Sequence, residues 1–353
     1  MSFKIADIDF IFLSFDEPNA EKNFADLKKK VPWAKRVHGV YGFDAAHKAC
    51  ADASDTERFI TVDGDTVIEE DFTKVMVDFP SLGVDNTYQF SWCGRIDLNG
   101  LQYGNGSLKC WTKDFVRQMK THENHDGKDK NVIEFCHFDN YYQFNENFST
   151  SYINASPFQA WRAGFREGVK MSLDRNARVD NIKNLWWQNY QRLLVWLNVG
   201  ADVDNGYFAI HGARLGCYLT NCTDWNIVQT REFDFYEKYW RMELNLKDMN
   251  NPFTIIRLSS VDEGNNNKIV PLKLISCELQ KGKTTNMTEY QSMPEKSYMN
   301  FYISDGERLL LNNKKVIEGN LERTFNIDLI HTEETRKYDT NKPNRNVFYE
   351  EYK

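Results

Sequence analysis

The stretch Phe59-Ile60-Thr61-Val62-Asp63-Gly64-Asp65 decides the fold of this chain. Its β-branched and aromatic residues predict a buried strand, because such side chains pack well on a pleated surface that is covered on both faces. The strand ends in two carboxylates separated by one glycine. Since open α/β sheets bind ligands at the carboxyl ends of their strands, we expect a ligand site at Asp63 and Asp65.

The chemistry of these two carboxylates favours a hard divalent cation, Mn²⁺ or Mg²⁺. A metal held by few protein ligands completes its shell with water and substrate phosphates, so a nucleotide diphosphate is the simplest cargo. Gly64 lets the backbone turn sharply and approach that cargo closely. The alternative is an ordinary hairpin turn, because Asp-Gly is also a favoured turn dipeptide.

Strands and helices alternate before this stretch. The expected elements are a strand at Ile8–Ser14, a helix that starts near Pro18 and ends near Lys30, a strand at Lys35–Gly39, and a helix at Phe43–Ala53. This alternation is typical of parallel βαβ units with right-handed crossovers. This pattern therefore predicts an α/β fold in which Asp63 ends the third strand of a nucleotide-binding half-sheet.

The rest of the chain divides into a helical middle section and a small C-terminal region. We expect a strand at Tyr88–Trp92, loops at Tyr103–Ser107 and His122–Asp129, and an aromatic and polar run at His137–Tyr142 that could line a site. Helices are expected from Ser156 through Val169, at Asn181–Leu197 and at Tyr207–Leu219. Strands at Phe253–Leu258, Ile269–Ile275 and Met299–Ile303 and a tail at Lys337–Arg345 follow. The expected domains are residues 1–225 and an accessory α+β region, 226–353.

Composition excludes several classes of protein. No run of eighteen apolar residues and no signal-peptide pattern is present, so we expect a cytoplasmic protein without a membrane partner. The seven cysteines include no Cys-x-x-Cys pair, which indicates reduced thiols. A net charge of −7 disfavours a surface that grips nucleic acid everywhere. Residues 162–192, with seven basic and three acidic residues and hence a local charge of +4, form either a basic face or solvated helices.

Several segments resemble one known family. They are Phe12-Leu13-Ser14-Phe15-Asp16-Glu17-Pro18, His38-Gly39-Val40, Ala45-Ala46-His47-Lys48-Ala49 and Val62-Asp63-Gly64-Asp65. This order resembles the nucleotide-sugar half of GT-A glycosyltransferases, particularly those of tailed bacteriophages. Tyr103-Gly104-Asn105-Gly106, the stretch Ala160–Glu167 and the stretch Gly212–Gly216 are similar to the same group. The resemblance covers roughly residues 8 to 225 and implies a GT-A-like sheet flanked by helices.

The resemblance also implies roles for individual residues. Asp65 would be a direct metal ligand, Asp63 would lie near the ribose or the metal, and Gly64 would allow close approach. The base would be cradled by the end of the first strand, namely Ser14, Phe15 and Asp16. GT-A enzymes often complete the metal shell with a downstream histidine, here His211, although the extended His-Gly-Lys-Pro-Trp context of some retaining enzymes is missing.

Basic and acidic residues outside these segments are further candidates. Lys48 could contact phosphate, with a solvated helix lysine as the alternative. Arg162 and Arg166 recur at helical spacing and would share one face, suited to the oxygens of a diphosphate or of an acceptor backbone. Glu167 or Asp139 would serve as general base if the reaction inverts the anomeric centre, whereas a retaining enzyme needs no such base.

The resulting hypothesis is a metal-dependent glycosyltransferase that moves a sugar from a UDP-sugar to a hydroxyl group. The phage resemblance implies 5-hydroxymethylcytosine in double-stranded DNA as acceptor and arabinose or glucose as the sugar. Such an enzyme would extrude the base, and the aromatic residues 138–142 would offer stacking surfaces. The alternatives are transfer to a protein or a surface glycan, and a non-catalytic nucleotide-binding phage protein. Oligomeric state, donor sugar and stereochemistry stay open.

Overall fold

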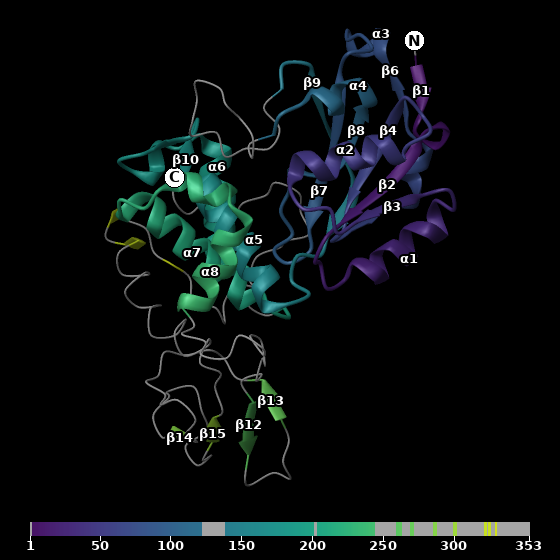
Figure 1. Cartoon of the computed structure of the whole chain (residues 1–353). Helices are drawn as coiled ribbons and strands as arrows, with labels where there is room; N and C mark the ends of the chain where they lie inside the picture. Colours follow the sequence, from purple (N-terminus) through teal and green to yellow (C-terminus); the bar gives the residue numbers. More distant parts are fainter. Residues whose placement is uncertain are drawn as a thin grey trace.

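A computed structural model describes the chain at residues 2–121, 138–200, 203–243, 259–262, 269–271, 285–287, 299–301, 321–322, 324–325 and 329. The expected loop at His122–Asp129, the expected strand at Phe253–Leu258 and the expected tail at Lys337–Arg345 lie outside these residues. The described part is an α/β structure in which a curled mixed sheet is flanked by helices (Figure 1).

The central sheet has seven strands in the order β3-β2-β4-β8-β7-β9-β5. Its strands are β2 (Asp9–Ser14), β3 (Lys35–His38), β4 (Arg58–Asp63), β5 (Thr66–Ile68), β7 (Gln89–Ile96), β8 (Gln102–Thr112) and β9 (Tyr141–Ser151). The first three along the chain, β2, β3 and β4, pair in parallel, as the alternation of strands and helices predicted. Strand β8 runs antiparallel to β4 and β7, and β9 runs parallel to β7 and antiparallel to β5.

The sheet curls because two residues join strands that stand four places apart. Only Gly64 and Asp65 separate β4 from β5, yet β8, β7 and β9 lie between them in the sheet. Four strand spacings of about 4.8 Å would need roughly 19 Å in a flat sheet, whereas three residues of extended chain span about 10 Å. The hairpin alternative for Asp63-Gly64-Asp65 is therefore wrong, since β4 and β5 do not pair with each other.

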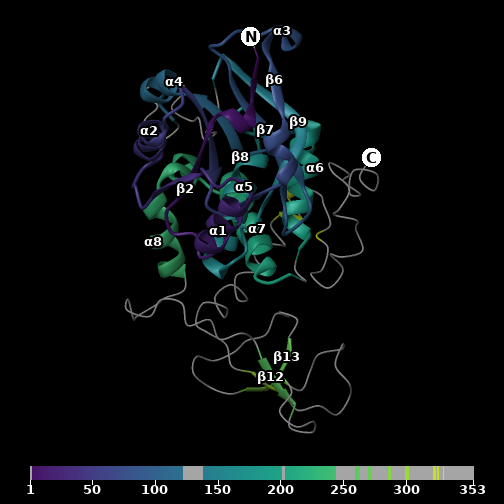
Figure 2. The ribbon, with the colours of Figure 1, turned by 90° about the vertical axis from the view of Figure 1, so that its right-hand side faces the viewer.

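Alternating side chains cover both faces of the sheet. Phe10, Phe12, Ile60 and Val62 join the core under α1 (Ala20–Lys30), whereas Ile11 and Phe59 join the core under α2 (Phe43–Ala53) and α4 (Lys113–Gln118). Figure 2 shows α2 and α4 side by side on the same face. The two covered faces explain why the strands read as continuous apolar runs.

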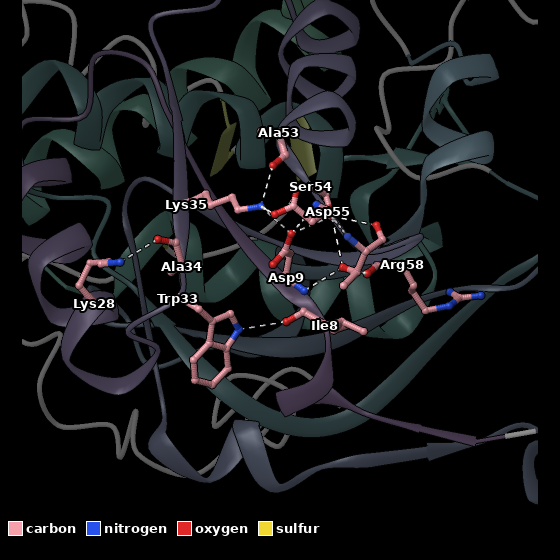
Figure 3. Close-up of polar contacts among 11 residues, drawn as sticks. Ile8, Asp9, Lys28, Trp33, Ala34, Lys35, Ala53, Ser54, Asp55 and Arg58 are labelled. Carbon is pink, nitrogen blue, oxygen red and sulfur yellow. Dashed lines mark hydrogen bonds and ion pairs between the residues drawn. The ribbon is translucent and has the colours of Figure 1, made fainter.

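A polar network holds the amino ends of β2, β3 and β4 together (Figure 3). Asp9 is buried, and its Oδ2 accepts from Lys35 Nζ at 2.9 Å and from the backbone N–H of Asp55 at 2.6 Å. Lys35 Nζ also donates to Asp55 Oδ2 at 2.6 Å and to the Ala53 carbonyl at 3.1 Å. A buried carboxylate is thereby paired and hydrogen-bonded, which is the arrangement that makes its burial tolerable.

The helical section lies beside the sheet and packs against the end of β7 and the start of β8, through Ile96 and Tyr103 (Figure 1). It comprises α5 (Pro157–Met171), α6 (Trp187–Asn198), α7 (Gly206–Cys222) and α8 (Phe233–Glu243). The Ser156 hydroxyl caps α5 by accepting the Gln159 N–H at 3.2 Å, as predicted. Helices α5 and α7 touch through glycines: a Cβ on Gly164 would lie 1.9 Å from the Ala209 carbonyl oxygen. Backbone contact of this kind leaves no room for any side chain.

The helical core extends beyond the expected domain boundary at residue 225. Tyr236 and Trp240 of α8, and also Leu321 and Phe325, are buried in the same apolar cluster as Trp161 of α5. Residues from the expected accessory region thus complete the core of the first. Among the described residues, β13 (Ile269–Pro271) and β15 (Met299–Phe301) begin where strands were expected, and with β12 (Ser259–Asp262) and β14 (Thr285–Met287) they form a four-stranded antiparallel sheet.

The remaining elements are short. They are β1 (Ser2–Lys4), which pairs with β6 (Met76–Asp78), the helix α3 (Phe79–Leu82), and the hairpin of β10 (Leu173–Asp174) and β11 (Ala177–Arg178), with single-turn helices at Ile5–Asp7, Glu70–Lys74, Ile182–Asn184 and Ile227–Arg231. The loop expected at Tyr103–Ser107 is wrong, because these residues lie within β8. In the part of the chain that the structure describes, no helix combines the length and apolarity needed to cross a membrane.

Candidate active site

The two aspartates lie at the carboxyl end of β4, beside the carboxyl end of the parallel strand β2. Asp63 is the last residue of β4 and stands opposite Leu13 of β2, one residue before that strand ends. The buried Asn23 of α1 donates its Nδ2–H to the Gly64 carbonyl at 3.0 Å, and the Tyr152 N–H donates to the Asp65 carbonyl at 2.8 Å. These bonds hold the turn between Asp63 and Asp65 in place.

Both carboxyl groups are harder to ionise than ordinary aspartates. Burial raises the pKa of Asp63 to about 6, and the negative charge of Glu17 adds to this effect. Burial, together with the charges of Asp63 and Glu17, raises the pKa of Asp65 to about 7. Three carboxylates therefore repel one another here, and a bound cation would relieve that repulsion.

Glu17 belongs to this acidic group although the sequence did not single it out. Its Oε2 accepts the Phe15 N–H at 2.8 Å. A Cβ on Gly64 would lie 2.5 Å from the same oxygen and 3.0 Å from Ser14 Cβ, so Gly64 allows the two chain segments to touch. The sequence signal was the position of Glu17, three residues after the strand that adjoins the metal strand.

Three cations balance these acids. Lys109 of β8 is buried opposite Thr61 of β4, and its positive charge lowers the pKa of Asp63, as does that of Arg166. Arg162 acts in the same direction on Asp65. Arg162 and Arg166 thus reach the acidic group from one face of α5, as their four-residue spacing predicted. Lys109 was missed, and its signal was a lysine inside the short apolar run Leu108-Lys109-Cys110-Trp111.

Arg162 has an unused donor at the site. Its side chain is 15% exposed and its Nη1 lies 3.5 Å from Asp16 Oδ2, too far for a hydrogen bond. That nitrogen is buried and has no hydrogen-bond partner among the residues that the structure describes. The guanidinium group also lies over the Phe233 ring, 4.6 Å from its centroid. An anionic ligand oxygen would satisfy this buried donor.

The expected base-binding residues sit beside an aromatic group. Ser14 Oγ accepts from Arg36 Nε and is bonded to His38 Nδ1, both at 3.0 Å. Phe15 meets the rings of Tyr41 and Phe233 edge-on, at centroid distances of 6.2 Å and 5.6 Å. Tyr41 is 61% exposed and donates its hydroxyl hydrogen to Asp234 Oδ1 at 3.2 Å. The contribution of Phe233 and Asp234 from α8 had no signal in the sequence.

Lys48 does not belong to this group of charges. It is exposed on α2, whereas its neighbour His47 is buried and is bonded through Nδ1 to the Phe43 carbonyl at 2.8 Å. Burial, with the positive charge of Lys109, lowers the pKa of His47 to about 4. The neutral His47 packs edge-on against the Trp111 ring, at a centroid distance of 6.1 Å, whereas Lys48 is exposed as the solvated alternative has it.

The expected metal shell of Asp63, Asp65 and His211 is not assembled. His211 is buried in α7, which packs on α5 and α6. Among the residues that the structure describes, no group of three or more His, Cys, Asp and Glu side chains could hold a metal ion. Among the described residues, the acidic group consists of Asp63, Asp65 and Glu17.

Neither expected general base has the right setting. Glu167 Oε2 accepts the Tyr103 hydroxyl at 2.7 Å and its Oε1 accepts from Lys170 Nζ at 3.0 Å. Burial pushes the pKa of Glu167 up, but Lys170 and Tyr103 outweigh it and leave the pKa below its usual value. A carboxylate so engaged is a weak base, so the catalytic assignment of Glu167 does not fit.

Asp139 lies at the opposite end of the sheet. It precedes β9, in which Tyr141 pairs with Gln89 of β7. When the pairing is followed from β7 to β8 and on to β4, Gln89 is level with Phe59. Asp63 is four residues further along, about 13 Å at 3.3 Å per residue. The assignment of Asp139 as a base acting beside Asp63 is therefore wrong.

The aromatic run and the basic stretch are used in packing. Phe138 and Tyr141 contact the Trp111 ring, and Tyr142 contacts Phe90 and Phe144, so these rings pack at the end of the sheet that lies away from Asp63. Arg178 donates to the carbonyls of Thr220 and Trp225, and Arg192 lies over the Tyr103 ring at 4.8 Å. The stretch 162–192 therefore does not form one basic face.

Comparison with protein families, curated proteins and solved structures gave no match. The fold and the site define the chain as an α/β protein with a curled mixed sheet, flanking helices, and an acidic group paired with arginines at the carboxyl ends of two parallel strands.

Proposed function

We propose that this chain is a metal-dependent glycosyltransferase of the GT-A type that uses a UDP-sugar. One observation carries the proposal. Two carboxylates with raised pKa values, Asp63 and Asp65, face Arg162 and Arg166 at the place where α/β sheets bind nucleotides. Carboxylates opposed by arginines suit a divalent cation that is bound to a diphosphate. The carboxylates would coordinate the cation, and the arginines would donate hydrogen bonds to the phosphate oxygens.

The proximity of two carboxylates with raised pKa values supports a divalent ion, because such an ion can complete its shell with water and a diphosphate. Asp65 and Asp63 would hold it, and it would neutralise the charge that develops on the leaving diphosphate. Arg162 would donate its unbonded Nη1–H to a phosphate oxygen, and Arg166 would act beside it. The exposed Tyr41 offers a face for the base, next to Phe15. The sugar itself is inferred from the sequence resemblance alone.

A substitution at Asp65 tests metal-dependent catalysis. The assay is Mn²⁺-dependent hydrolysis of UDP-glucose and UDP-arabinose by the full chain. We expect Asp65→Asn to abolish hydrolysis and Asp71→Asn, an exposed carboxylate paired with Lys74, to leave it unchanged. Unchanged hydrolysis in Asp65→Asn, or hydrolysis that persists in excess EDTA, would contradict the proposal.

The acceptor proposal is 5-hydroxymethylcytosine in duplex DNA. It is supported by the resemblance to phage enzymes. Residues 138–142 do not support it, because they lie at the other end of the sheet from Asp63. Labelled UDP-sugar would be incubated with hydroxymethylated and with unmodified duplex of the same sequence. Incorporation only into the hydroxymethylated duplex is the expected result, whereas equal or absent incorporation would refute this acceptor and leave a protein or surface glycan as the alternative.

A second candidate function is non-catalytic nucleotide binding. It is favoured by the two observations that weaken catalysis: Glu167 is engaged by Tyr103 and Lys170, and the described residues form no three-ligand metal group. Calorimetry with UDP and Mn²⁺ separates the two functions. Binding that depends on Arg162, without turnover of any UDP-sugar, would establish the non-catalytic alternative.

A further inference from the structure

A cavity lies at the amino-terminal edge of the sheet, away from Asp63 and Asp65. Its volume is about 800 Å³, within the range of small-molecule sites. Arg58, the first residue of β4, lines it, whereas Asp63 is the last residue of that strand. Five residues at about 3.3 Å each separate the two by roughly 16 Å. Figures 1 and 2 show this end of the sheet, with the N-terminus and α3, directed away from α8.

Aromatic rings form one part of the cavity wall. Phe115 and Phe138 meet edge-on with their centroids 4.9 Å apart, and Phe3 and Phe79 do so at 5.8 Å. The Arg58 guanidinium lies 5.3 Å from the centroid of Phe3 and 5.5 Å from that of Phe79. The wall thus already holds one guanidinium group against its ring faces.

The charged residues around the rings are mostly acidic. Glu57, Asp114 and Asp139 line the cavity and are exposed, and Arg58 is the basic residue among the lining residues. Arg58 is committed to the protein, since its Nη1 and Nη2 donate to the carbonyls of Tyr88 at 2.9 Å and Asn86 at 2.8 Å. Asp114 lies 3.9 Å from Arg117, a distance that leaves the contact weak.

From this combination we infer that the cavity binds an organic cation, a guanidinium or a primary amine, against Phe115 and Phe138 and beside Asp139 and Glu57. Aromatic faces attract cations through their ring quadrupole, and three carboxylates at the rim raise the local concentration of positive charge. The cation is either a free small molecule or the arginine or lysine side chain of a protein partner. The inference is independent of the proposed function at Asp63 and Asp65.

The test uses butylguanidinium as probe and butylurea as its uncharged isostere. Fluorescence of the full chain reports binding through Trp111, whose ring stacks on Phe115 at 5.7 Å and meets Phe138 at 6.1 Å. We expect a saturable change with butylguanidinium, weakening at high salt, and none with butylurea. Equal responses to both, or no response at millimolar probe, would overturn the inference.

Matched variants place the binding in this cavity. Asp139→Asn and Glu57→Gln should each weaken butylguanidinium binding about threefold to tenfold, the range expected for exposed charge pairs and cation–π contacts. Asp71→Asn, an exposed acid elsewhere, should not, and an unaltered affinity in Asp139→Asn would refute the site. An arginine-containing peptide that binds at least tenfold more tightly than butylguanidinium would identify a protein side chain as the source, and equal affinities would identify a free cation.

Discussion

Replacing Asp65 by asparagine should stabilise the ligand-free protein at neutral and alkaline pH. The pKa of Asp65 rises from its ordinary value of 3.8 to about 7, because of burial and the charges of Asp63 and Glu17. A raised carboxyl pKa means that the folded state binds the proton more tightly than the unfolded chain does. The ionised group therefore costs stability, and that cost grows as the pH rises from about 4 to about 7.

The magnitude follows from the shift. Each pKa unit corresponds to about 1.36 kcal/mol, so a shift of about 3 units amounts to about 4 kcal/mol at pH 8. At pH 5 most of the Asp65 carboxyl is protonated in the folded state, and the same calculation leaves about 2 kcal/mol. Asparagine removes the charge with little change in shape. The variant should therefore exceed the wild type in free energy of unfolding by these amounts, with the larger gain at pH 8.

Urea denaturation at pH 5, 6, 7 and 8, with metal chelated, measures this dependence. Asp71→Asn is the control, because an exposed substitution should alter the free energy of unfolding by less than about 0.5 kcal/mol. Adding Mn²⁺ should raise the stability of the wild type and not that of Asp65→Asn, since the proposed ion site needs the Asp65 carboxylate. Equal stability of the two proteins at pH 8, or a variant less stable than the wild type, would refute the reasoning.

Three further outcomes are expected. Gly168→Ala should lower the free energy of unfolding by about 2 kcal/mol or more in urea denaturation, because its Cβ would lie 2.1 Å from the Ala213 carbonyl oxygen; wild-type stability would contradict the close packing of α5 on α7. Asp9→Asn should cost about 2 kcal/mol at pH 7. Burial raises the pKa of Asp9 but hydrogen bonds from Lys35 and the Asp55 N–H outweigh it, so this stabilisation is present above about pH 4 and is lost below it; an acid unfolding profile identical in the variant would disprove it. Arg162→Met should weaken UDP binding in calorimetry by about tenfold to a hundredfold, whereas the exposed Arg117→Met should not.

The first third of the fold could be predicted because its signals are local. Helix α2 has the bounds Phe43–Ala53 that the sequence indicated, and β4 ends at Asp63 as expected. Prolines and capping residues act on the few residues next to them in the chain. A strand that is covered on both faces is a continuous apolar run, which can be recognised in the sequence. The expected helix starting at Ser156 was confirmed for the same reason.

Other predictions failed where distant chain segments decide the structure. Tyr103–Ser107 resembles a loop because of its glycines, yet Gly104 lies in β8, where a Cβ would be 2.0 Å from Gln143 Oε1 of β9. Glycine there makes room for the Gln143 side chain, which comes from β9 on the far side of β7. Asp139 belongs to the aromatic and polar run that could line a site, and it does line a cavity, at the other end of the sheet from Asp63.

The sequence by itself determined that Asp63 and Asp65 end a buried parallel strand, because hydrophobic patterning and turn chemistry are written in consecutive residues. Only the tertiary structure decided which charges surround them. Glu17, Lys109 and Arg162 come from separate elements, and they meet because the sheet curls and α5 packs across its edge. The interaction between two charges depends on their distance in space. Residues from separate elements reach a short distance only when the helices and the sheet pack together.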